Sequence, residues 1–294
     1  MYEIINQKRG VITIKIALIT DSSCNLPVED IAKYNIHILP LQISTVEKTY
    51  QDDGKDLKTN EIYELIEKEV PKTSMPNLGR AINLLEQLKE EGYTHALAIH
   101  ISKGLSGTYE MVYGLKEKAD EIGIKLEVID SNSISMGLGF LVLRAAKMLE
   151  NSDTLGNIID TILRLKEKTR VYFVVKTLEY LRKGGRIGKI EGGLGDLLNF
   201  KPIISINKEG VYYTVEKVRG RKKSLKAIAD LVEKEIADKK VELSVLHGNA
   251  IDEAKEVYER FSHTIKNVSV LDITSALGVH VGPGLIGICY SEIE

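Results

Sequence analysis

The chain has 294 residues, of which 43% are hydrophobic and 28% are charged, and its formal net charge is −2. This balance is typical of a folded protein with a sizeable core, and it excludes a long disordered chain, a fibrous repeat or a strongly basic nucleic-acid-binding surface. Because the length exceeds the usual size of one compact domain, we expect two lobes.

The first half of the chain alternates between apolar segments and segments with helical spacing. Strands are predicted at residues 12–20, 36–44, 94–102 and 125–131, and helices at residues 60–70, 77–91, 108–123 and 136–150. Alternation of strand and helix is typical of a parallel sheet with helices on its faces. We therefore predict an N-terminal parallel-sheet α/β lobe over residues 15–165, preceded by an extension of residues 1–14.

The order of predicted strands and helices changes after residue 165. Residues 201–218 have the pattern of two strands around a turn at Asn207–Gly210, which predicts a β-hairpin. Further helices are predicted at residues 222–238 and 252–262, and further strands at residues 241–247, 268–273 and 285–290. We therefore predict a C-terminal α+β lobe with a mixed sheet over residues 166–294, and we expect the two lobes to pack closely because no flexible linker separates them.

Signals for export, membrane insertion and metal binding are lacking in the sequence. No stretch has the length and apolarity of a membrane span, and the first 18 residues lack the apolar core and cleavage site of a signal peptide, so a cytoplasmic location is predicted. Cys24 and Cys289 lie far apart, and the six histidines form no HxxxH or HExxH pattern. We predict neither a disulfide framework nor a metal site, and no cofactor.

Hydroxyl-rich loops follow three of the predicted strands, and a fourth precedes a predicted helix. They cover residues 20–23, 102–108, 130–133 and 72–77. Ligands of open α/β sheets bind beyond the carboxyl ends of the strands. Serines in such loops usually cap helices, but Ser106 is followed by Gly107, which lets a ligand approach the backbone. His280 is predicted to stand in a rigid glycine-rich turn, GVHVGPGLIG, that aims its imidazole at the cleft between the lobes.

These residue types allow more than one chemistry. Hydroxyl and backbone donors with one histidine can bind a carboxylate or phosphate oxygen without a fixed cation. Alternatively, Ser106 and His280 form the nucleophile and base of a serine hydrolase or acyltransferase, with Asp21 or Asp130 as the orienting acid. The enzyme alternative is less favoured because GLSGT departs from the GxSxG elbow. A third alternative is a binding module for another small molecule or for a protein.

Two basic stretches form a separate feature. LRKGGRIGK at residues 181–189 and VRGRKKSLK at residues 218–226 contain Arg182, Arg186, Arg219 and Arg221. Such loops are often only solvated, but arginine on a glycine-rich loop can also make bidentate contacts with an acidic group. These four arginines are therefore predicted to dock an acidic protein or a phosphate. Nucleotide binding by this chain is not indicated, because no GxxxxGK[ST] or GxGxxG pattern occurs.

Seven stretches of the chain together resemble the DegV family, the bacterial fatty-acid-binding proteins that include the FakB subunits of fatty acid kinase. The stretches occur in family order and cover nearly the whole chain from about residue 15. They are IALITDSSCNLP at 16–27, KTSMPN at 72–77, ISKGLSGTYE at 101–110, VIDSNSISMGLG at 128–139, LRKGGRIG at 181–188, KPIISINKEGVYYTVEKVRGRKKSL at 201–225 and GVHVGPGLIGICY at 278–290.

The resemblance implies one long-chain fatty acid between the two lobes. Its carboxylate is expected to be held by Thr73 or Ser74 and by Ser106, with the Gly107 backbone nearby and His280 close to it. The family loop usually reads TSQP, whereas this chain has methionine at the third position. The first 14 residues have no counterpart in the family pattern.

The resemblance also implies a division of labour between two proteins. The fatty-acid-binding chain has no catalytic activity of its own, and a separate ATP-dependent kinase converts the presented carboxylate into an acyl phosphate. Arg182, Arg186, Arg219 and Arg221 are then candidates for docking that kinase. A head-group site without a cation is expected to leave the carboxylate oxygen more nucleophilic.

Overall fold

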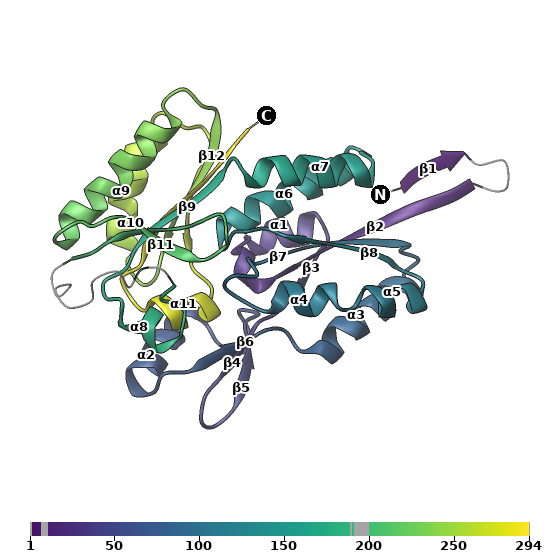
Figure 1. Cartoon of the computed structure of the whole chain (residues 1–294), viewed down its shortest axis with the longest axis horizontal. Coiled ribbons are helices and arrows are strands. Elements are labelled where there is room, and N and C mark those ends of the chain that lie inside the picture. Colours follow the sequence, from purple (N-terminus) through teal and green to yellow (C-terminus); the bar gives the residue numbers. More distant parts are fainter. Residues whose placement is uncertain (1, 7–10, 189, 191–199, 294) are drawn as a thin grey trace.

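The computed structural model describes residues 2–6, 11–188, 190 and 200–293, and it has two lobes (Figure 1). The predicted architecture, an N-terminal parallel-sheet lobe and a C-terminal mixed-sheet lobe, is confirmed. The boundary near residue 165 stays a prediction. No helix in the part of the chain that the structure describes is long and apolar enough to cross a bilayer.

The N-terminal lobe is built on a parallel sheet with strand order β3-β2-β7-β8. Its strands are β2 (Val11–Asp21), β3 (Ile36–Leu39), β7 (His95–His100) and β8 (Lys125–Asp130). The backbone of β1 (Tyr2–Asn6) pairs antiparallel with the first part of β2. Apolar runs such as the LAI of β7 are buried because helices cover the sheet.

Helices cover both faces of this parallel sheet (Figure 1). One face carries α3 (Leu78–Glu90), α4 (Thr108–Tyr113) and α5 (Lys116–Ile122). The other face carries α1 (Val28–Lys33), α6 (Met136–Glu150) and α7 (Leu155–Lys166), while the short 3-10 turn η1 (Ser22–Cys24) follows β2.

The C-terminal lobe is built on a six-stranded sheet with order β11-β10-β9-β14-β12-β13, in which only β12 and β13 run parallel. Its strands are β9 (Thr169–Val174), β10 (Ile203–Ile206), β11 (Tyr212–Glu216), β12 (Val241–His247), β13 (Val268–Asp272) and β14 (Ile286–Glu292). Helices α9 (Arg221–Ile236) and α10 (Ile251–Ser262) cover one face. The predicted hairpin at residues 201–218 is confirmed as β10 and β11.

A small third sheet joins the two lobes. Strands β4 (Gln42–Ser44), β5 (Thr49–Gln51) and β6 (Lys72–Ser74) pair antiparallel in the order β5-β4-β6. Helices α2 (Thr59–Lys68), α8 (Glu179–Lys183) and α11 (Ser275–Val281) lie beside it. The apolar side chains between them form one cluster, in which Ile43 of β4 and Ile62 of α2 pack with Ala276 and Val279 of α11.

Three sequence predictions differ from the observed elements. Residues 36–44 form two strands in different sheets, and Pro40, which has no backbone N–H to donate, lies between them with Leu41. The predicted helix 108–123 is two helices, interrupted at Gly114, and the second ends at Gly123 in the left-handed conformation as expected. The loop 72–77 begins with strand β6, in which Thr73 is opposite Ile43.

The tip of the β10–β11 hairpin fastens the two lobes together. Ser102 donates its hydroxyl hydrogen to the Gly210 carbonyl at 2.8 Å, and the Asn132 amide donates to the Asn207 carbonyl at 3.2 Å. Gly210 has φ of +80°, and a Cβ atom there would overlap with the Ser102 hydroxyl. Both the backbone conformation and the close approach therefore require glycine at this position.

We expect Gly210→Ala to destabilise the protein more than Gly54→Ala. Gly54 also has positive φ, +69°, but no atom lies within 4 Å of the position that a Cβ would take. Gly54→Ala should therefore show only the backbone strain, about 1 kcal/mol. Gly210→Ala adds the overlap with Ser102. Urea denaturation of both variants measures the difference, and equal losses in the free energy of unfolding would contradict this role for the hairpin tip.

Candidate ligand-binding site

A cavity lies between the two lobes and is lined mainly by apolar side chains. It has an empty volume of about 810 Å³, open solvent included. Its walls come from β9, β14 and α11 and from the loops after β7 and β8. The apolar members include Ile101, Leu105, Ile134, Val171, Phe173, Leu246, Ile273, Leu277, Val281 and Leu285.

The strand pattern of the C-terminal sheet explains why this space is left open. Side chains alternate along β9, so that Val171 and Phe173 face the cavity while Val174 packs beneath the covering helices. On the neighbouring strand β14 the residues that line the cavity are Gly287 and Cys289, both small. Burial raises the pKa of the Cys289 thiol to about 12, so this side chain is an uncharged part of the wall.

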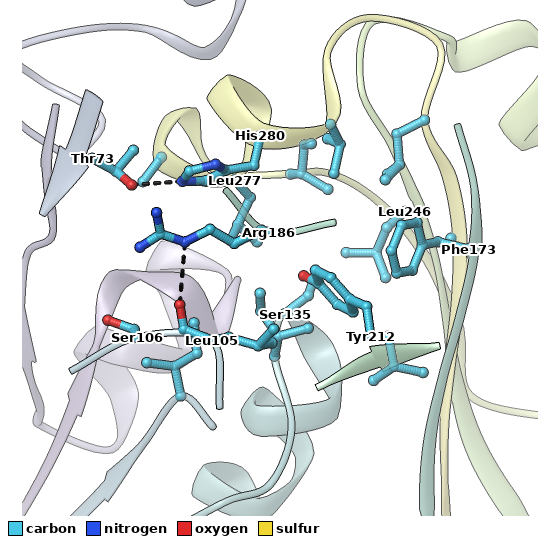
Figure 2. Close-up of a pocket in the computed structure, with 18 of the residues that line it drawn as sticks. Thr73, Leu105, Ser106, Ser135, Phe173, Arg186, Tyr212, Leu246, Leu277 and His280 are labelled. Carbon is cyan, nitrogen blue, oxygen red and sulfur yellow. Dashed lines mark hydrogen bonds between the residues drawn. The ribbon is translucent and has the colours of Figure 1, made fainter. Parts of the chain in front are cut away.

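Polar groups gather at one end of the cavity (Figure 2). Thr73, Ser106, Arg186 and His280 lie there, whereas Phe173, Leu246 and Tyr212 line the opposite side. The four polar residues come from β6, from the loop before α4, from the loop after α8, and from the last turn of α11. The cavity therefore has an apolar interior and a polar end, which is the arrangement that an amphipathic ligand with one polar head requires.

Thr73 and His280 form a hydrogen bond across the polar end, with 2.6 Å between Thr73 Oγ1 and His280 Nε2. The Nδ1 atom of His280 is buried and has no hydrogen-bond partner among the described residues. A Cβ atom on Gly184 would overlap with Nδ1, so the glycine leaves room for the ring. When the proton is on Nε2, the ring donates to Thr73 and the threonine hydroxyl hydrogen is available to a ligand.

His280 is not in a glycine-rich turn, as the sequence analysis predicts, but in helix α11, which ends at Gly282 with φ of +67°. Burial, and to a lesser extent the charge of Arg186, lower the pKa of His280 from its ordinary value to about 4. The imidazole is therefore neutral at pH 7, and it acts as a hydrogen-bonding group without adding charge to the site.

Arg186 brings a cation to the polar end of the cavity. Its Nε atom donates to the Leu105 carbonyl at 3.4 Å, and its Nη1 atom donates to the Gly184 carbonyl at 2.7 Å. Figure 2 shows the guanidinium between Ser106 and the Thr73–His280 pair. The sequence prediction of a head-group site without a cation is therefore wrong. The glycine-rich loop was interpreted as a partner surface, whereas its turn directs Arg186 inward.

The predicted hydroxyl donors differ in their contacts. Ser106 lines the cavity, and its hydroxyl lies 2.9 Å from that of Thr108 and accepts the Thr108 backbone N–H at 3.3 Å. Ser74 also lines the cavity. Gly107 is exposed beside the site, and the Met75 sulfur lies 3.5 Å from the position that a Cβ on Gly107 would take. Met75 therefore covers the outside of the Ser106 loop rather than lining the cavity.

Comparison with known proteins decides the family. Residues 15–292 match the sequence pattern of the family described as uncharacterised proteins of the DegV family. The chain belongs to the DegV family. A DegV domain-containing protein of Clostridium acetobutylicum is 43% identical to it over 282 residues, which are 95% of this chain and 99% of the relative.

Solved structures share the fold of this chain. A fatty acid binding DegV family protein from Streptococcus agalactiae superposes with a TM-score of 0.88 and 30% identity, covering 96% of this chain and all of that one. A stearic-acid-binding protein from Eubacterium ventriosum superposes with a TM-score of 0.86 and 25% identity, covering 95% of this chain and 98% of that one.

The remaining predicted arginines of this DegV chain lie in different environments. Arg182 of α8 and Arg219 are exposed. Arg221 instead pairs with Glu253 through two hydrogen bonds of 3.0 and 2.6 Å, and it also donates to the Gly284 carbonyl at 2.7 Å. Because the Arg221 guanidinium is engaged inside the C-terminal lobe, Arg182 and Arg219 are the better candidates for a partner surface.

The geometry does not favour a serine hydrolase or acyltransferase on this DegV scaffold. His280 is hydrogen-bonded to Thr73, while the hydroxyl of Ser106 is directed to Thr108. Asp21 is buried at the end of β2, where its carboxylate binds His100 at 2.9 Å and the Ile101 N–H at 3.0 Å. The Asp130 carboxylate accepts the backbone N–H of Asn132 in its own loop and that of Lys103 in the neighbouring loop. Neither aspartate orients His280, so the triad does not form.

We expect the lowered pKa of His280 to produce a specific pH dependence of stability. The folded-state pKa, about 4, lies below the ordinary value, so protonation favours the unfolded chain. The contribution of His280 is complete above pH 6.5 or so and is lost as the pH falls towards 4. His280→Gln should remove this part of the pH dependence in urea denaturation between pH 7 and pH 4. Parallel curves for the two proteins would contradict the assignment.

Proposed function

We propose that this protein binds one long-chain fatty acid between its lobes, with the alkyl chain in the apolar interior of the cavity and the carboxylate at Thr73, Ser106, Arg186 and His280. The observation that carries the proposal is the cavity with an apolar interior and with Thr73, Ser106, Arg186 and His280 at one end. The similarity to a DegV family protein described as fatty acid binding and to a protein described as stearic acid binding supports it. Ser74 and the Gly107 backbone lie beside the head group as further donors.

The two ends of such a ligand contribute differently to binding. Each buried methylene group contributes about 0.8 kcal/mol, so the tail of a C16 acid supplies on the order of 10 kcal/mol. The carboxylate costs free energy when it leaves water, and hydrogen bonds from hydroxyl groups and a guanidinium offset that cost. The tail therefore supplies most of the binding free energy, and the polar end determines the position of the carboxylate.

The carboxylate of the bound acid is a substrate for a separate ATP-dependent kinase, and this chain has no catalytic activity of its own. In that reaction a carboxylate oxygen attacks the γ-phosphorus of ATP held by the kinase. A bond forms from carboxylate oxygen to phosphorus, the bond from phosphorus to the β,γ-bridging oxygen breaks, and ADP leaves. This chain positions the nucleophile at the protein surface, and the kinase supplies the phosphoryl donor.

Native mass spectrometry of the protein purified from a bacterial host tests the binding. We expect an added mass equal to one fatty acid, which organic extraction then identifies. Protein that carries no lipid, and that also fails to take up added palmitate, would overturn the proposal.

Ser106→Ala refines the same test at the head group. Loss of a hydrogen bond to a charged group weakens binding by about 1.5–3 kcal/mol, which corresponds to at least a tenfold rise in Kd for palmitate. Ser262→Ala is the control, because Ser262 lies at the end of α10, remote from the cavity lining, and donates to the Glu259 carbonyl. Unchanged palmitate affinity in Ser106→Ala would exclude this serine as a carboxylate donor.

Docking of the kinase is tested by reversing charge at the two exposed arginines. We expect Arg182→Glu combined with Arg219→Glu to lower acyl phosphate formation in the coupled reaction at least tenfold while the Kd for palmitate stays the same. Lys118→Glu, at an exposed position in α5, is the control. Equal loss of palmitate binding and of coupled activity would show that these arginines act on the fold instead of on the partner.

A further inference from the structure

The apolar wall of the cavity has a gap on strand β14, in the middle of the C-terminal sheet. Strand β14 lies between β9 and β12, and Gly287 faces the cavity while its neighbours Ile286 and Ile288 pack beneath the covering helices. In the register of the sheet, Gly287 is opposite Phe173 of β9 on one side and Leu246 of β12 on the other. The middle member of this row has no side chain, so a gap separates two large apolar side chains.

The two side chains that border the gap are held by their neighbours. The ring of Phe173 packs edge to face against the ring of Tyr212, with 5.1 Å between the ring centroids and an interplanar angle of 71°. Leu246 is buried, and it belongs to the same apolar cluster as Ile273. Packing therefore fixes both borders of the gap.

Neither backbone conformation nor packing requires glycine at residue 287. Its φ lies outside the left-handed region. A Cβ atom there would lie 3.5 Å from the Tyr172 carbonyl oxygen and 3.6 Å from Leu246 Cβ, which are ordinary van der Waals distances. Glycine in the interior of a strand costs conformational entropy and contributes no side chain to the packing. The protein therefore leaves this space open at some cost in stability, which is expected where a ligand approaches the backbone closely.

Gly287 lies at the end of the cavity that is remote from the carboxylate donors. Figure 2 shows Phe173 and Leu246, its two neighbours in the sheet, on the side opposite Thr73 and His280. A fatty acid with its carboxylate at the polar end extends its alkyl chain towards this side. The last carbons of a long acid then lie above Gly287, whereas a shorter acid ends before it.

We propose that Gly287 determines the acyl chain length that the protein accepts, because the terminal carbons of long fatty acids occupy the gap between Phe173 and Leu246. This inference rests on the proposed function and names a specificity-determining residue for it. Each methylene group buried in the gap raises the affinity about fourfold. A side chain at residue 287 therefore weakens long acids selectively, since short acids gain nothing from the gap.

Four saturated acids of increasing length, laurate, myristate, palmitate and stearate, are the probes for this role. Their Kd values are measured by displacement of a fluorescent fatty acid, which is itself titrated first, from wild-type protein, Gly287→Val, Gly287→Ala and the control Ile288→Val. We expect Gly287→Val to weaken stearate at least tenfold and laurate less than twofold, because the isopropyl group fills the gap. Gly287→Ala should weaken stearate about threefold and leave laurate unchanged.

The control separates the cavity from the sheet that carries it. Ile288 is the next residue of β14 and belongs to the cluster beneath the covering helices. Ile288→Val alters the packing of the same strand without adding atoms to the cavity. It should leave the dependence of Kd on chain length as it is in wild-type protein.

The outcomes distinguish this inference from the proposed function. If wild-type protein binds palmitate but the Gly287 variants keep its dependence on chain length, or weaken all four acids equally, the role of Gly287 is excluded while fatty acid binding stands. If wild-type protein binds none of the four acids, the proposed function itself is overturned. Urea denaturation verifies folding of each variant. Should Gly287→Val fail to fold, Gly287→Ala decides alone, because its methyl group makes only ordinary contacts.

Discussion

Packing of helix α6 between the two sheets is the constraint on which the rest of the structure depends. The helix is buried along most of its length, from Met136 to Leu149, and it contacts strands of both lobes. Its side chains belong to one apolar cluster with Leu97 of β7 and Phe173 of β9. Because both lobes share this core, separating them would expose a large apolar surface. Entry of a ligand by local movement of the surrounding loops would therefore cost less free energy than separation of the lobes.

The electrostatics of the polar end follow from burial and one cation. Arg186 supplies the positive charge, and burial together with that charge keeps His280 neutral. A second cation beside Arg186 would repel it, whereas a neutral imidazole adds a hydrogen bond through Thr73 without that cost. The Arg186 guanidinium also donates to two backbone carbonyls, so a carboxylate ligand is not its only acceptor. The polar end therefore combines one positive charge with neutral hydrogen-bonding groups, and the proposed carboxylate site rests on this combination.

The sequence predicts the two-lobed fold and much of the site because those features depend on local patterns. Alternating strands and helices indicate the parallel sheet, and Thr73, Ser106 and His280 do line one cavity. The sequence predicts Arg186 on a partner surface, because a basic glycine-rich stretch has the same composition whether its turn faces inward or outward. It predicts a turn at His280 because of the glycines around it, whereas packing against α2 and α8 stabilises helix α11 there. Such effects depend on contacts between residues distant in sequence. The spacing of apolar residues along the chain carries no information about those contacts.

The glycines of the loops beside the polar end of the cavity differ in what requires them. Glycine is required at residues 104 and 188 by packing, since a Cβ there would collide with the carbonyls of Gly210 and Tyr212. At Gly185 the backbone conformation, with φ of +69°, favours glycine. Gly107 has neither reason, because its φ is −73° and its nearest neighbour is the flexible end of Met75. Gly107 is the N-cap residue of α4, a position at which glycine is favoured, and its lack of a side chain also leaves the backbone next to Ser106 uncovered on that side.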